Sequence, residues 1–575
     1  MPVANADIAG ELDRLADLLE IEGANPFRVR AYRRAARVVE ALPRSVSDML
    51  AAGEDLDALP GVGKDLAGKI AAIAAGRRLP LLDELERALP PGVTALLALP
   101  GLGPKRVRAL HERLGVSDLA SLAEAARSGR LRSLAGFGPT IEARILEAVA
   151  KGAGQPARRK LRAAEQVAEP ILRHLRAARE VLAAEVAGSY RRRQETVGDL
   201  DLVVASTAPE AAIAHFLRYE EIARVAERGP TRSIVALRNG MQVDLRAVEP
   251  AAYGAALAYF TGSKAHNIAL RRIAAEKGLK LNEYGLFRGR RRIAGRTEEE
   301  VYAALGLPLI PPELREDRGE IAAAQRGALP RLVALGDIRG DLHAHTDASD
   351  GRAGLREMAR AAQARGYAYL AVTDHSRRLA MAHGLGPKEL ARQIAEIHRL
   401  NARTAPGFVL LASVEVDILE DGRLDLPDPI LRDLDLVVGA VHSRFDLPRE
   451  KQTERLLRAM DNPCLDIVAH PTGRLINARP PCALDLERLL RAARERGCHF
   501  ELNAQPDRLD LPDTVCRLAK EIGVRLAIST DAHGTEELEF MRYGVDQARR
   551  GWLEPGDILN TRALPELRAM LRRRR

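Results

Sequence analysis

The sequence is poor in cysteine and has no long apolar run. Its only cysteines are Cys464, Cys482, Cys498 and Cys516, and no two of them form a Cys-x-x-Cys pair. This usage indicates a reduced, cytosolic chain. No apolar stretch approaches the roughly 18 residues of a membrane span, and the N-terminal residues lack the basic segment and apolar run of a signal peptide. We therefore expect a cytoplasmic protein without a membrane anchor.

Tracts rich in serine, glutamine or proline are also absent, so long disorder is not expected. The hydrophobic fraction is 46%, enough for several packed cores, and the length predicts about four domains at roughly 150 residues each. The net charge is +9 and the pI about 9.5. A basic balance favours a polyanionic partner, although a GC-rich genome that over-uses arginine would give the same charge.

A pattern repeats three times in the first 150 residues, where apolar residues follow helical spacing. The copies are LPGVGKDLAGKIAAI from Leu59, LPGLGPKRVRALHER from Leu99 and LAGFGPTIEARILEA from Leu134. In each, Gly-x-Gly precedes an amphipathic helix, so the backbone can approach a phosphate and the helix N-terminus can bind it. The pattern resembles the helix-hairpin-helix motif, which grips the DNA backbone without reading sequence. The residues expected to contact DNA here are Gly61, Gly63, Gly101, Gly103 and Lys105. The third copy, with Pro139 and Thr140, has fewer basic residues and is the loosest match.

Three aspartates indicate a phosphoryl-transfer site in the mixed α+β region that follows. Asp199 and Asp201 lie two apart in a strand-like run and therefore share one face, and Asp244 lies on another such run. Buried carboxylates repel one another, so they need divalent cations to stay ionised. Three carboxylates around two metal ions suit in-line nucleotidyl transfer. Ser189, after Gly188, fits a turn that binds triphosphate, and Arg192 adds positive charge.

The chain from Asp337 onward alternates β-like apolar runs with helices, which predicts a parallel β/α barrel. Metal-type residues follow successive runs, at the strand ends where such barrels place active sites. The candidate ligands are His343, His345, Asp350, His375, Glu415, His442, His470, Asp531 and His533. Mixed nitrogen and oxygen ligands suit Mn²⁺ or Zn²⁺ better than Mg²⁺.

The signature GSYRR…GDLD, the segment YFTGSKAHN from Tyr259 and the segment GLKLNEYGLF from Gly278 resemble the family X DNA polymerases, the family of DNA polymerase beta. The resemblance covers residues 1 to about 315. It implies that Asp199, Asp201 and Asp244 are catalytic and hold Mg²⁺ or Mn²⁺, and that Ser189 and Arg192 contact the triphosphate. It further implies that Tyr259, Phe260 and Gly262 shape the sugar pocket, Asn267 reaches the base edge and Arg271 touches the template side. Lys264 stands where many relatives carry an acidic residue, and its cation could grip the incoming nucleotide.

The C-terminal cluster resembles the polymerase and histidinol phosphatase (PHP) domain, a distorted β/α barrel with up to three metal ions. The resemblance implies one ion held by His343, His345, Glu415 and Asp531. It implies a second ion held by Glu415, His442 and His470, and a third held by Asp350, His375 and His533. The activity implied is a 3′→5′ exonuclease, with 3′-phosphatase or abasic-site endonuclease activity as further options.

A lyase activity is a separate question. By the resemblance, Lys69 aligns with the family's Schiff-base lysine, which needs a depressed pKa. However, Asp65 replaces a lysine beside it, and Phe27 and Arg28 stand where the family has His and Lys. An acidic neighbour raises the pKa of a lysine and weakens the nucleophile, so Lys69 as a plain surface residue remains an alternative.

The sequence therefore predicts a multidomain DNA-repair polymerase of family X that fills short gaps, joined to a metal-dependent phosphoesterase. The expected units are a helical lyase-like domain (1–80), a helix-hairpin-helix fingers-like domain (81–154), a palm (155–250), a thumb-like domain (251–315), a linker (316–336) and the PHP domain (337–575). The expected partners are gapped or primer-template DNA and deoxynucleoside triphosphates, and the expected state is a monomer. An RNA or tRNA nucleotidyltransferase and a non-catalytic DNA-gap scaffold remain as alternatives.

Overall fold

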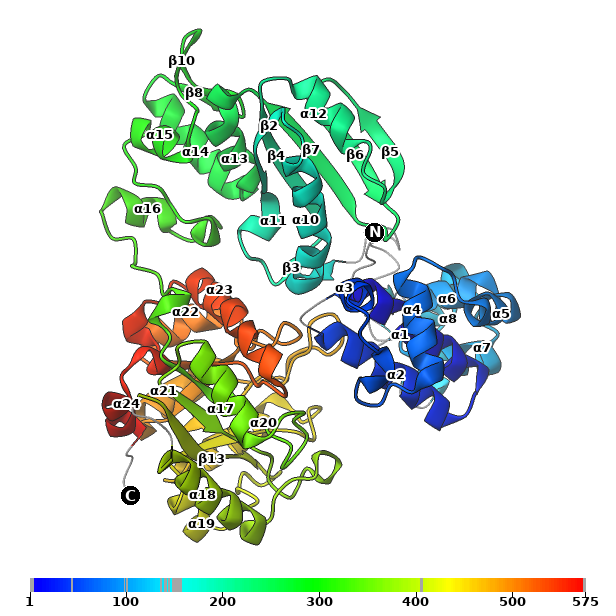
Figure 1. Ribbon diagram of the computed structural model, residues 1–575, viewed down its shortest axis with the longest axis vertical. Coiled ribbons are helices and arrows are strands. Elements are labelled where there is room, and N and C mark those ends of the chain that lie inside the picture. The colour runs from blue at the N-terminus through cyan, green and yellow to red at the C-terminus, as the bar shows by residue number, and fades with distance from the viewer. Residues whose placement is uncertain are drawn as a thin grey trace.

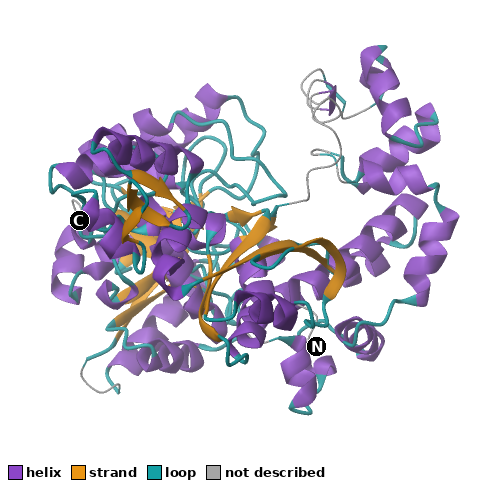
Figure 2. Cartoon of the chain, turned by 90° about the horizontal axis from the view of Figure 1, so that it is seen from above, coloured by secondary structure: helices purple, strands orange, loops and turns teal. Residues whose placement is uncertain are grey.

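The computed structural model describes residues 5–42, 45–97, 99, 102–134, 137–138, 142, 145–146, 158–403 and 407–571. Figure 1 shows three lobes: an N-terminal helical lobe in blue, a sheet-containing lobe in cyan and green, and a C-terminal lobe that runs from green to red. Seen from above (Figure 2), the strands lie in the left and central parts of the molecule, and the right-hand part consists of helices and loops.

Helices alone make up the N-terminal lobe over its described residues. They are α1 (Asn5–Glu22), α2 (Pro26–Ala41), α3 (Val46–Ala51), α4 (Lys64–Ala74), α5 (Pro80–Ala88), α6 (Pro91–Leu96), α7 (Pro104–Leu114) and α8 (Leu119–Arg127). Asn25 caps α2, and Pro26 at its first position pre-sets the helical backbone. Gly63 and Gly103 stand at the N-termini of α4 and α7 without a side-chain cap, so the first helical N–H groups stay open to an anion. Gly101, Pro139 and Thr140 lie outside the described residues.

The palm is a five-stranded sheet in the order β2-β4-β7-β6-β5. Its strands are β2 (Val181–Val186), β4 (Asp199–Ser206), β5 (Ile222–Arg228), β6 (Arg232–Leu237) and β7 (Gln242–Val248). β4 and β7 pair in parallel, and the other pairs are antiparallel. Alternation along β4 sends Leu202 and Val204 into the core shared with α10 (Leu161–Arg176) and α12 (Pro209–Phe216). Val203 points the other way, toward α13 (Tyr253–Thr261), so Asp199 and Asp201 share the face that α13 covers.

The thumb-like unit packs helices against a small hairpin sheet. It contains α13, α14 (Lys264–Glu276), β8 (Lys280–Asn282), β9 (Gly285–Arg288), β10 (Arg291–Ala294) and α15 (Glu298–Ala304). The following segment, expected as a linker, includes helix α16 (Glu320–Gln325). The Oε1 atom of Glu320 lies 2.6 Å from Nδ1 of buried His266 on α14, and Ala324 joins the thumb core. This segment therefore packs on the thumb.

The C-terminal lobe is a parallel sheet of seven strands in sequential order. The strands are β11 (Gly340–Ala344), β12 (Tyr369–Val372), β13 (Val409–Asp417), β14 (Leu436–Ala440), β15 (Ile467–Val468), β16 (His499–Asn503) and β17 (Leu526–Ser529). A parallel bridge between Ala344 and Ala532 brings the two edge strands together, so the sheet is nearly closed. Helices α17 (Leu355–Ala364), α18 (Pro387–Asn401), α20 (Arg449–Asp461), α21 (Leu486–Arg496), α22 (Asp513–Ile522) and α23 (Met541–Arg550) belong to this lobe.

Helix α24 (Leu564–Leu571) fills the N-terminal end of the barrel. Its Leu567 and Leu571 pack with Leu342, Tyr369 and Leu436 near the starts of their strands. That end is therefore plugged by apolar side chains, which leaves the C-terminal strand ends for chemistry. The fold class predicted from the sequence is confirmed: helical hairpins, a mixed central sheet and a barrel-like parallel sheet. Among the described residues, no helix is both long and apolar enough to span a bilayer.

Candidate active sites

The aspartate trio converges at the start of the parallel pair β4–β7. Asp201 lies directly opposite Asp244 in the strand register, and Asp199 precedes Asp201 by two residues on the same face. Burial, together with the negative charges of Asp199 and Asp244, raises the pKa of Asp201 to about 7. The three carboxylates therefore repel one another, and a cation between them would relieve this repulsion.

A tight turn presses against Asp201. The turn is α11 (Gly188–Arg191), and Ala187 N donates a hydrogen bond of 2.6 Å to the Asp201 carbonyl oxygen. Gly188 has φ +61°, and a Cβ built there would lie only 2.2 Å from Asp201 Oδ2. Only glycine fits this position, because any other side chain would push the carboxylate aside. The turn thereby brings Ser189 next to the aspartate trio.

Arg192 follows this turn and reaches the thumb. Its Nη1 donates to the Thr261 carbonyl oxygen at 2.6 Å, and its Nε donates to Glu316 Oε1 at 3.0 Å. These bonds place its guanidinium beside Gly262, whose φ is +69°. The structure thus brings Arg192 and Gly262, two predicted nucleotide contacts, together from distant parts of the sequence.

Two arginines beside the trio were not predicted from the sequence. Arg232 Nη2 lies 2.9 Å from Asp244 Oδ2, and Arg246 Nε lies 3.3 Å from Asp244 Oδ1. Arg232 is on β6, two residues before Ile234, which pairs with Asp244. Arg232 and Asp244 therefore lie on the same face of the sheet. Alternation within RSIVAL and QVDLRAV predicts which residues of each strand share a face, but it does not predict that the two strands are neighbours. These two arginines offset the negative charge of Asp244, and the charges of Asp199 and Asp201 remain for a divalent metal to neutralise.

The remaining nucleotide-pocket candidates line the end of α13 and the start of α14. The rings of Tyr259 and Phe260 meet edge to face with centroids 5.2 Å apart. Asn267 Nδ2 donates to the Tyr259 carbonyl oxygen at 2.6 Å. Lys264 is exposed at the N-terminus of α14, and Arg271 is exposed further along the same helix. The two cations therefore face solvent, where a substrate could reach them.

The nine ligand candidates of the barrel all gather at the C-terminal strand ends. Glu415 is fully buried at the centre, and its oxygens lie 2.7 Å from His375 Nδ1, 2.9 Å from His470 Nε2 and 3.3 Å from His442 Nε2. His345 Nε2 lies 3.1 Å from Asp531 Oδ1. Asp350 Oδ1 lies 3.5 Å from His375 Nε2 and 3.4 Å from His533 Nε2.

Three overlapping sets of these side chains have ligand atoms within 4.8 Å of one another. The sets are His345, Asp350, His375 and His533; His343, His345 and Glu415; and His375, Glu415 and His442. His345 and His375 thus each belong to two sets, whereas the predicted partition assigned each of them to a single ion. The partition into three ions remains a prediction.

The electrostatics of this cluster suit cation binding. Burial alone would raise the pKa of Glu415, but His375 and His442 hold it well below its usual value, so it stays ionised. Burial and the nearby His533 and His375 lower the pKa of His345 to about 3, which keeps its ring neutral. Within the part of the chain that the structure describes, His345 Nδ1 is buried without a hydrogen-bond partner. Ionised carboxylate and neutral imidazole are the ligand forms that metals require, so Glu415 and His345 suit an ion, which would also satisfy the orphaned nitrogen. Against the effect of burial, the carboxylates of the cluster raise the pKa of His375, His442 and His533, so these rings would release protons when a metal binds.

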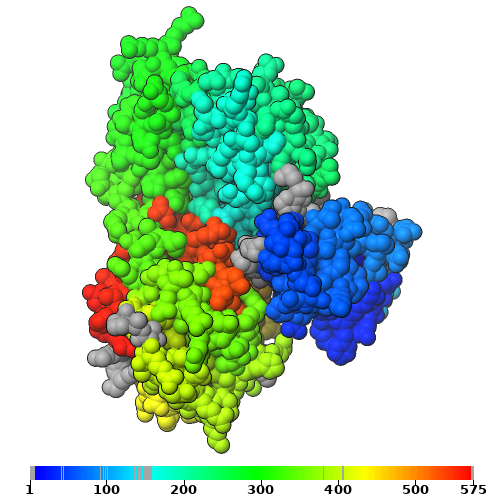
Figure 3. Space-filling model, viewed as in Figure 1, coloured from blue at the N-terminus to red at the C-terminus, as the bar shows by residue number. Residues whose placement is uncertain are grey.

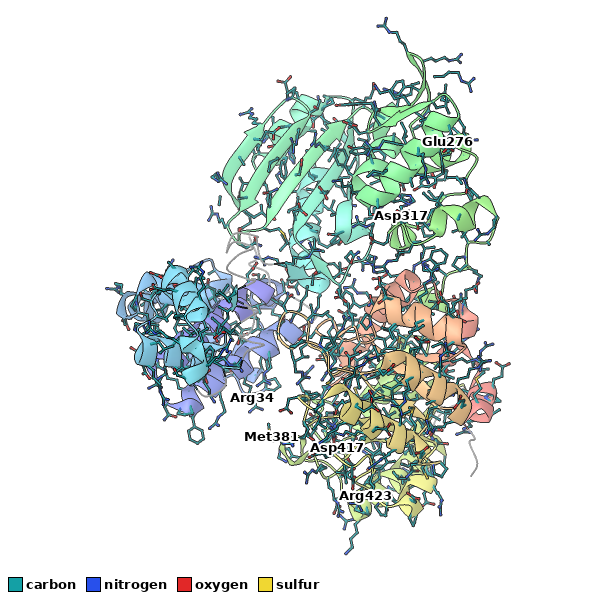
Figure 4. All side chains as sticks on the ribbon, turned by 180° about the vertical axis from the view of Figure 1, so that it is seen from behind. Arg34, Glu276, Asp317, Met381, Asp417 and Arg423 are labelled. Atoms are coloured by element: carbon teal, nitrogen blue, oxygen red, sulfur yellow. The ribbon has the colours of Figure 1, made fainter. Side chains whose placement is uncertain are left out.

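Two carboxylates that contact the candidate ligands were likewise not predicted from the sequence. Glu501 Oε1 lies 2.7 Å from His343 Nδ1, and Glu501 Oε2 accepts a 2.7 Å bond from His470 N. Asp417, on β13 two residues after Glu415, lies 3.1 Å from His442 Nδ1; Figure 4 labels it in the barrel lobe. Carboxylates of this kind orient metal-binding histidines. Glu501 lies within the strand-like run HFELNAQ, as Glu415 lies within SVEVD, and this signal could have identified it.

Lys69 has the neighbour that the sequence analysis noted. Its Nζ donates to Asp65, its fourth neighbour on α4. Burial lowers the pKa of Lys69, but the hydrogen bonds with Asp65 and Tyr32 outweigh burial and raise the pKa overall. A raised pKa keeps the amine protonated and weakens it as a nucleophile. Arg28 lines a nearby cavity of about 320 Å³ together with Gly63, whereas Phe27 is 75% exposed.

Gly63 and Gly103, two of the hairpin glycines expected to bind DNA, present open backbone, whereas the Arg34 side chain lies against Gly61. Gly61 has φ +74°, which glycine adopts without strain. A Cβ at Gly63 or Gly103 would meet nothing within 4 Å, so a phosphate could approach these N–H groups. Lys105 is exposed in the first turn of α7.

The fold, the aspartate trio and the barrel cluster define a class of protein: a nucleotidyltransferase palm joined to a barrel phosphoesterase, with DNA-binding hairpins N-terminal to both. Family models agree with this division. A helix-hairpin-helix domain matches residues 3–79, a SAM-like helix-hairpin-helix tandem matches 93–151, and a DNA polymerase beta thumb matches 256–316.

The chain is 40% identical to "DNA polymerase/3'-5' exonuclease PolX" of Bacillus subtilis over 99% of both chains. It therefore belongs to the bacterial family X DNA polymerases that carry a C-terminal PHP domain. The barrel region is also 34% identical to a "Probable phosphatase" of Caldanaerobacter subterraneus, covering 34% of this chain and 75% of that protein. A "Probable phosphatase" of Acetivibrio thermocellus is 32% identical, over 34% of this chain and 78% of its own. These findings favour the polymerase over an RNA or tRNA nucleotidyltransferase and over a silent scaffold.

Proposed function

We propose that this protein fills short gaps in DNA by adding nucleotides at the palm and trims 3′ ends at the barrel. The observation that carries the proposal is Asp201 facing Asp244 across parallel strands, with the Gly188 turn packed against it. Mg²⁺ or Mn²⁺ held by the aspartates would supply the positive charge that two-metal nucleotidyl transfer requires.

The residues around the trio take complementary roles in this proposal. Ser189 and Arg192 bind the triphosphate from the turn that abuts Asp201. Tyr259, Phe260 and Gly262 shape the sugar pocket, which Arg192 reaches through Thr261. Asn267 addresses the base edge, and the exposed cations Lys264 and Arg271 contact the nucleotide and the template side. The hairpin glycines Gly61, Gly63, Gly101 and Gly103, with Lys105, hold the DNA backbone.

The barrel cluster acts on the 3′ end of a DNA strand in this proposal. Its nine side chains would hold up to three ions of Mn²⁺ or Zn²⁺, which supply Lewis acidity for phosphoester hydrolysis. Glu501 and Asp417 fix the ring orientation of His343 and His442 through their Nδ1 atoms. The 3′→5′ exonuclease is the principal activity proposed, with 3′-phosphatase or abasic-site endonuclease action as variants of the same chemistry.

The two activities complement each other chemically. A blocked or mismatched 3′ end cannot act as a nucleophile, so an activity that restores a free 3′-hydroxyl supplies the substrate of the polymerase. The partners proposed are gapped or primer-template DNA and deoxynucleoside triphosphates. The protein is proposed to work as a cytoplasmic monomer.

Two single variants test this division of labour. Wild type, Asp199→Ala and His470→Ala are incubated with one-nucleotide-gapped DNA, nucleotides and Mg²⁺ or Mn²⁺. Asp199→Ala should lose primer extension and keep 3′ trimming, and His470→Ala should show the reverse, so each activity serves as the folding control for the other. Extension by Asp199→Ala would remove the palm assignment, and trimming by His470→Ala would remove the barrel assignment.

A further inference from the structure

The turn that carries Ser189 and Arg192 is held by side chains of the barrel. Arg193 follows Arg192 with φ +55° and donates from Nε to Asp546 Oδ2 at 2.7 Å. Glu195, two residues further on, accepts a 2.6 Å bond from Arg474 Nη2. Asp546 lies on α23 and Arg474 follows β15, so both partners belong to the C-terminal lobe.

Arg550, the last residue of α23, makes the most direct contact with this turn. It is only 4% exposed, and its Nη1 donates to the Arg192 carbonyl oxygen at 2.7 Å. The same Nη1 lies 3.0 Å from Glu316 Oε1, and Nη2 lies 2.6 Å from Asp513 Oδ2. A buried guanidinium with three acceptors in its fork has a fixed orientation.

Glu316 is shared between the barrel and the nucleotide turn. One of its oxygens, Oε1, accepts from Arg192 Nε at 3.0 Å, from Gln194 Nε2 at 2.5 Å and from Arg550 Nη1 at 3.0 Å. Burial alone would raise the pKa of Glu316, but Arg192 and Arg550 outweigh it and lower the pKa. Because one carboxylate is shared by two guanidinium groups, it neutralises the charge of Arg192 only in part, and the remaining positive charge can attract a triphosphate.

Helix α23 links this network to the barrel cluster along one short stretch of chain. It begins directly after the 3₁₀ helix η7 (Thr535–Phe540), where Glu537 Oε2 accepts a 2.8 Å bond from His533 N. Figure 3 shows the orange and red atoms of this region against the cyan and green atoms of the middle lobe. Asp317, next to Glu316, is labelled at this junction in Figure 4.

We propose that Arg550 and Glu316 are positioning residues for the polymerase, through which the barrel holds Arg192 ready for the nucleotide's triphosphate. This inference rests on the proposed function of the palm. Without Arg550, the Arg192 carbonyl loses a donor and the full charge of Glu316 falls on Arg192, so the carboxylate competes with the incoming phosphates. Without the charge of Glu316, the guanidinium of Arg192 loses its anchor.

Steady-state incorporation of one nucleotide into gapped DNA tests this role in the full-length protein. Arg550→Met should raise the nucleotide KM about tenfold and change kcat by about twofold at most, because a ground-state phosphate contact is misplaced. Arg550→Lys keeps the charge but cannot serve three acceptors in a fork, so its KM should lie between wild type and Arg550→Met. Glu316→Gln should also raise KM. The double variant Arg550→Met/Glu316→Gln should raise KM by less than the product of the single effects, because the residues act in one network.

Arg549→Met is the matched control. Arg549 is the neighbouring residue of α23. Its Nε pairs with Glu313 Oε1 at 2.7 Å and its Nη1 donates to the Val333 carbonyl oxygen at 3.2 Å, and neither partner belongs to the nucleotide turn. Its nucleotide KM should equal that of wild type. The 3′ trimming activity of each variant reports whether the barrel is folded, and Glu316→Gln, outside the barrel, carries the same test if Arg550→Met fails to fold. An unchanged KM in Arg550→Met or in Glu316→Gln, or equal effects from Arg549→Met, overturns the inference. Loss of extension in wild type would instead overturn the proposed function.

Discussion

Replacing Gly188 by alanine tests how closely the turn at Gly188 must approach the carboxylates that are proposed to be catalytic. The added Cβ would lie 2.2 Å from Asp201 Oδ2, whereas ordinary contacts begin at 3.4 Å. The carboxylate or the turn must therefore move by roughly 1 Å, and a displacement of about 1 Å at a reacting centre costs on the order of 100-fold in rate. The alanine also takes on a left-handed backbone, which costs about 1–2 kcal/mol. We expect kcat for single-nucleotide incorporation to fall about 100-fold, with 3′ trimming unchanged.

Gly240→Ala is the control that separates the effect of the close contact with Asp201 from the cost of placing alanine in a left-handed backbone conformation. Gly240 has φ +82°, and a Cβ there meets nothing within 4 Å. This variant should therefore lose a similar amount of stability while extending primers at the wild-type rate. The reasoning is refuted if Gly188→Ala incorporates nucleotides as fast as Gly240→Ala does in a rapid-quench assay on gapped DNA.

Three further predictions follow from individual side chains. Glu501→Gln weakens the hydrogen bond that orients His343, so 3′ trimming should fall roughly 10- to 100-fold while gap filling stays constant. A variant that trims as fast as wild type at both saturating and limiting Mn²⁺ would contradict this. Asp65→Asn removes the carboxylate that raises the pKa of Lys69, so borohydride trapping on abasic DNA at pH 7 should increase; an unchanged yield means that Lys69 is not a nucleophile. The pKa of Asp201 is raised to about 7, so its protonated form stabilises the fold at low pH and this stability is lost as pH rises through 7. In EDTA, Asp201→Asn should therefore unfold at a higher temperature than wild type at pH 8, and the difference should shrink toward pH 5; a difference independent of pH would refute the cause assigned.

The local pattern of apolar and polar residues was enough to predict the strands, the helix-hairpin-helix repeats and the polar residues that follow the barrel strands. Alternation placed Asp199 and Asp201 on one face, and the parallel register then set Asp244 opposite Asp201. The gathering of the candidate ligands in the barrel was predictable because most of them follow apolar runs, and parallel strands bring their carboxyl ends to one edge. Their role as metal ligands stays a prediction. Gly188 was recognised as part of a turn, but its contact with Asp201 depends on tertiary packing.

Contacts between distant segments could not be predicted in the same way. Arg232 reaches Asp244 from a neighbouring strand, and nothing in its local sequence distinguishes it from the many other arginines. Arg550 lies 358 residues from Arg192, so no spacing rule connects them. The position of helix α16 within residues 316–336 likewise depends on the pairing of Glu320 with His266. A charged stretch after prolines looks like a linker when its partner is not known.

The central claim is that three carboxylates on neighbouring strands carry out nucleotide addition. Single-turnover incorporation by Asp244→Asn, measured with prebound gapped DNA and saturating nucleotide, tests it most directly. Asparagine has the same shape but lacks the charge, so the account predicts a loss of at least about 1,000-fold in rate with 3′ trimming and nucleotide binding retained. Incorporation within tenfold of wild type would contradict the claim.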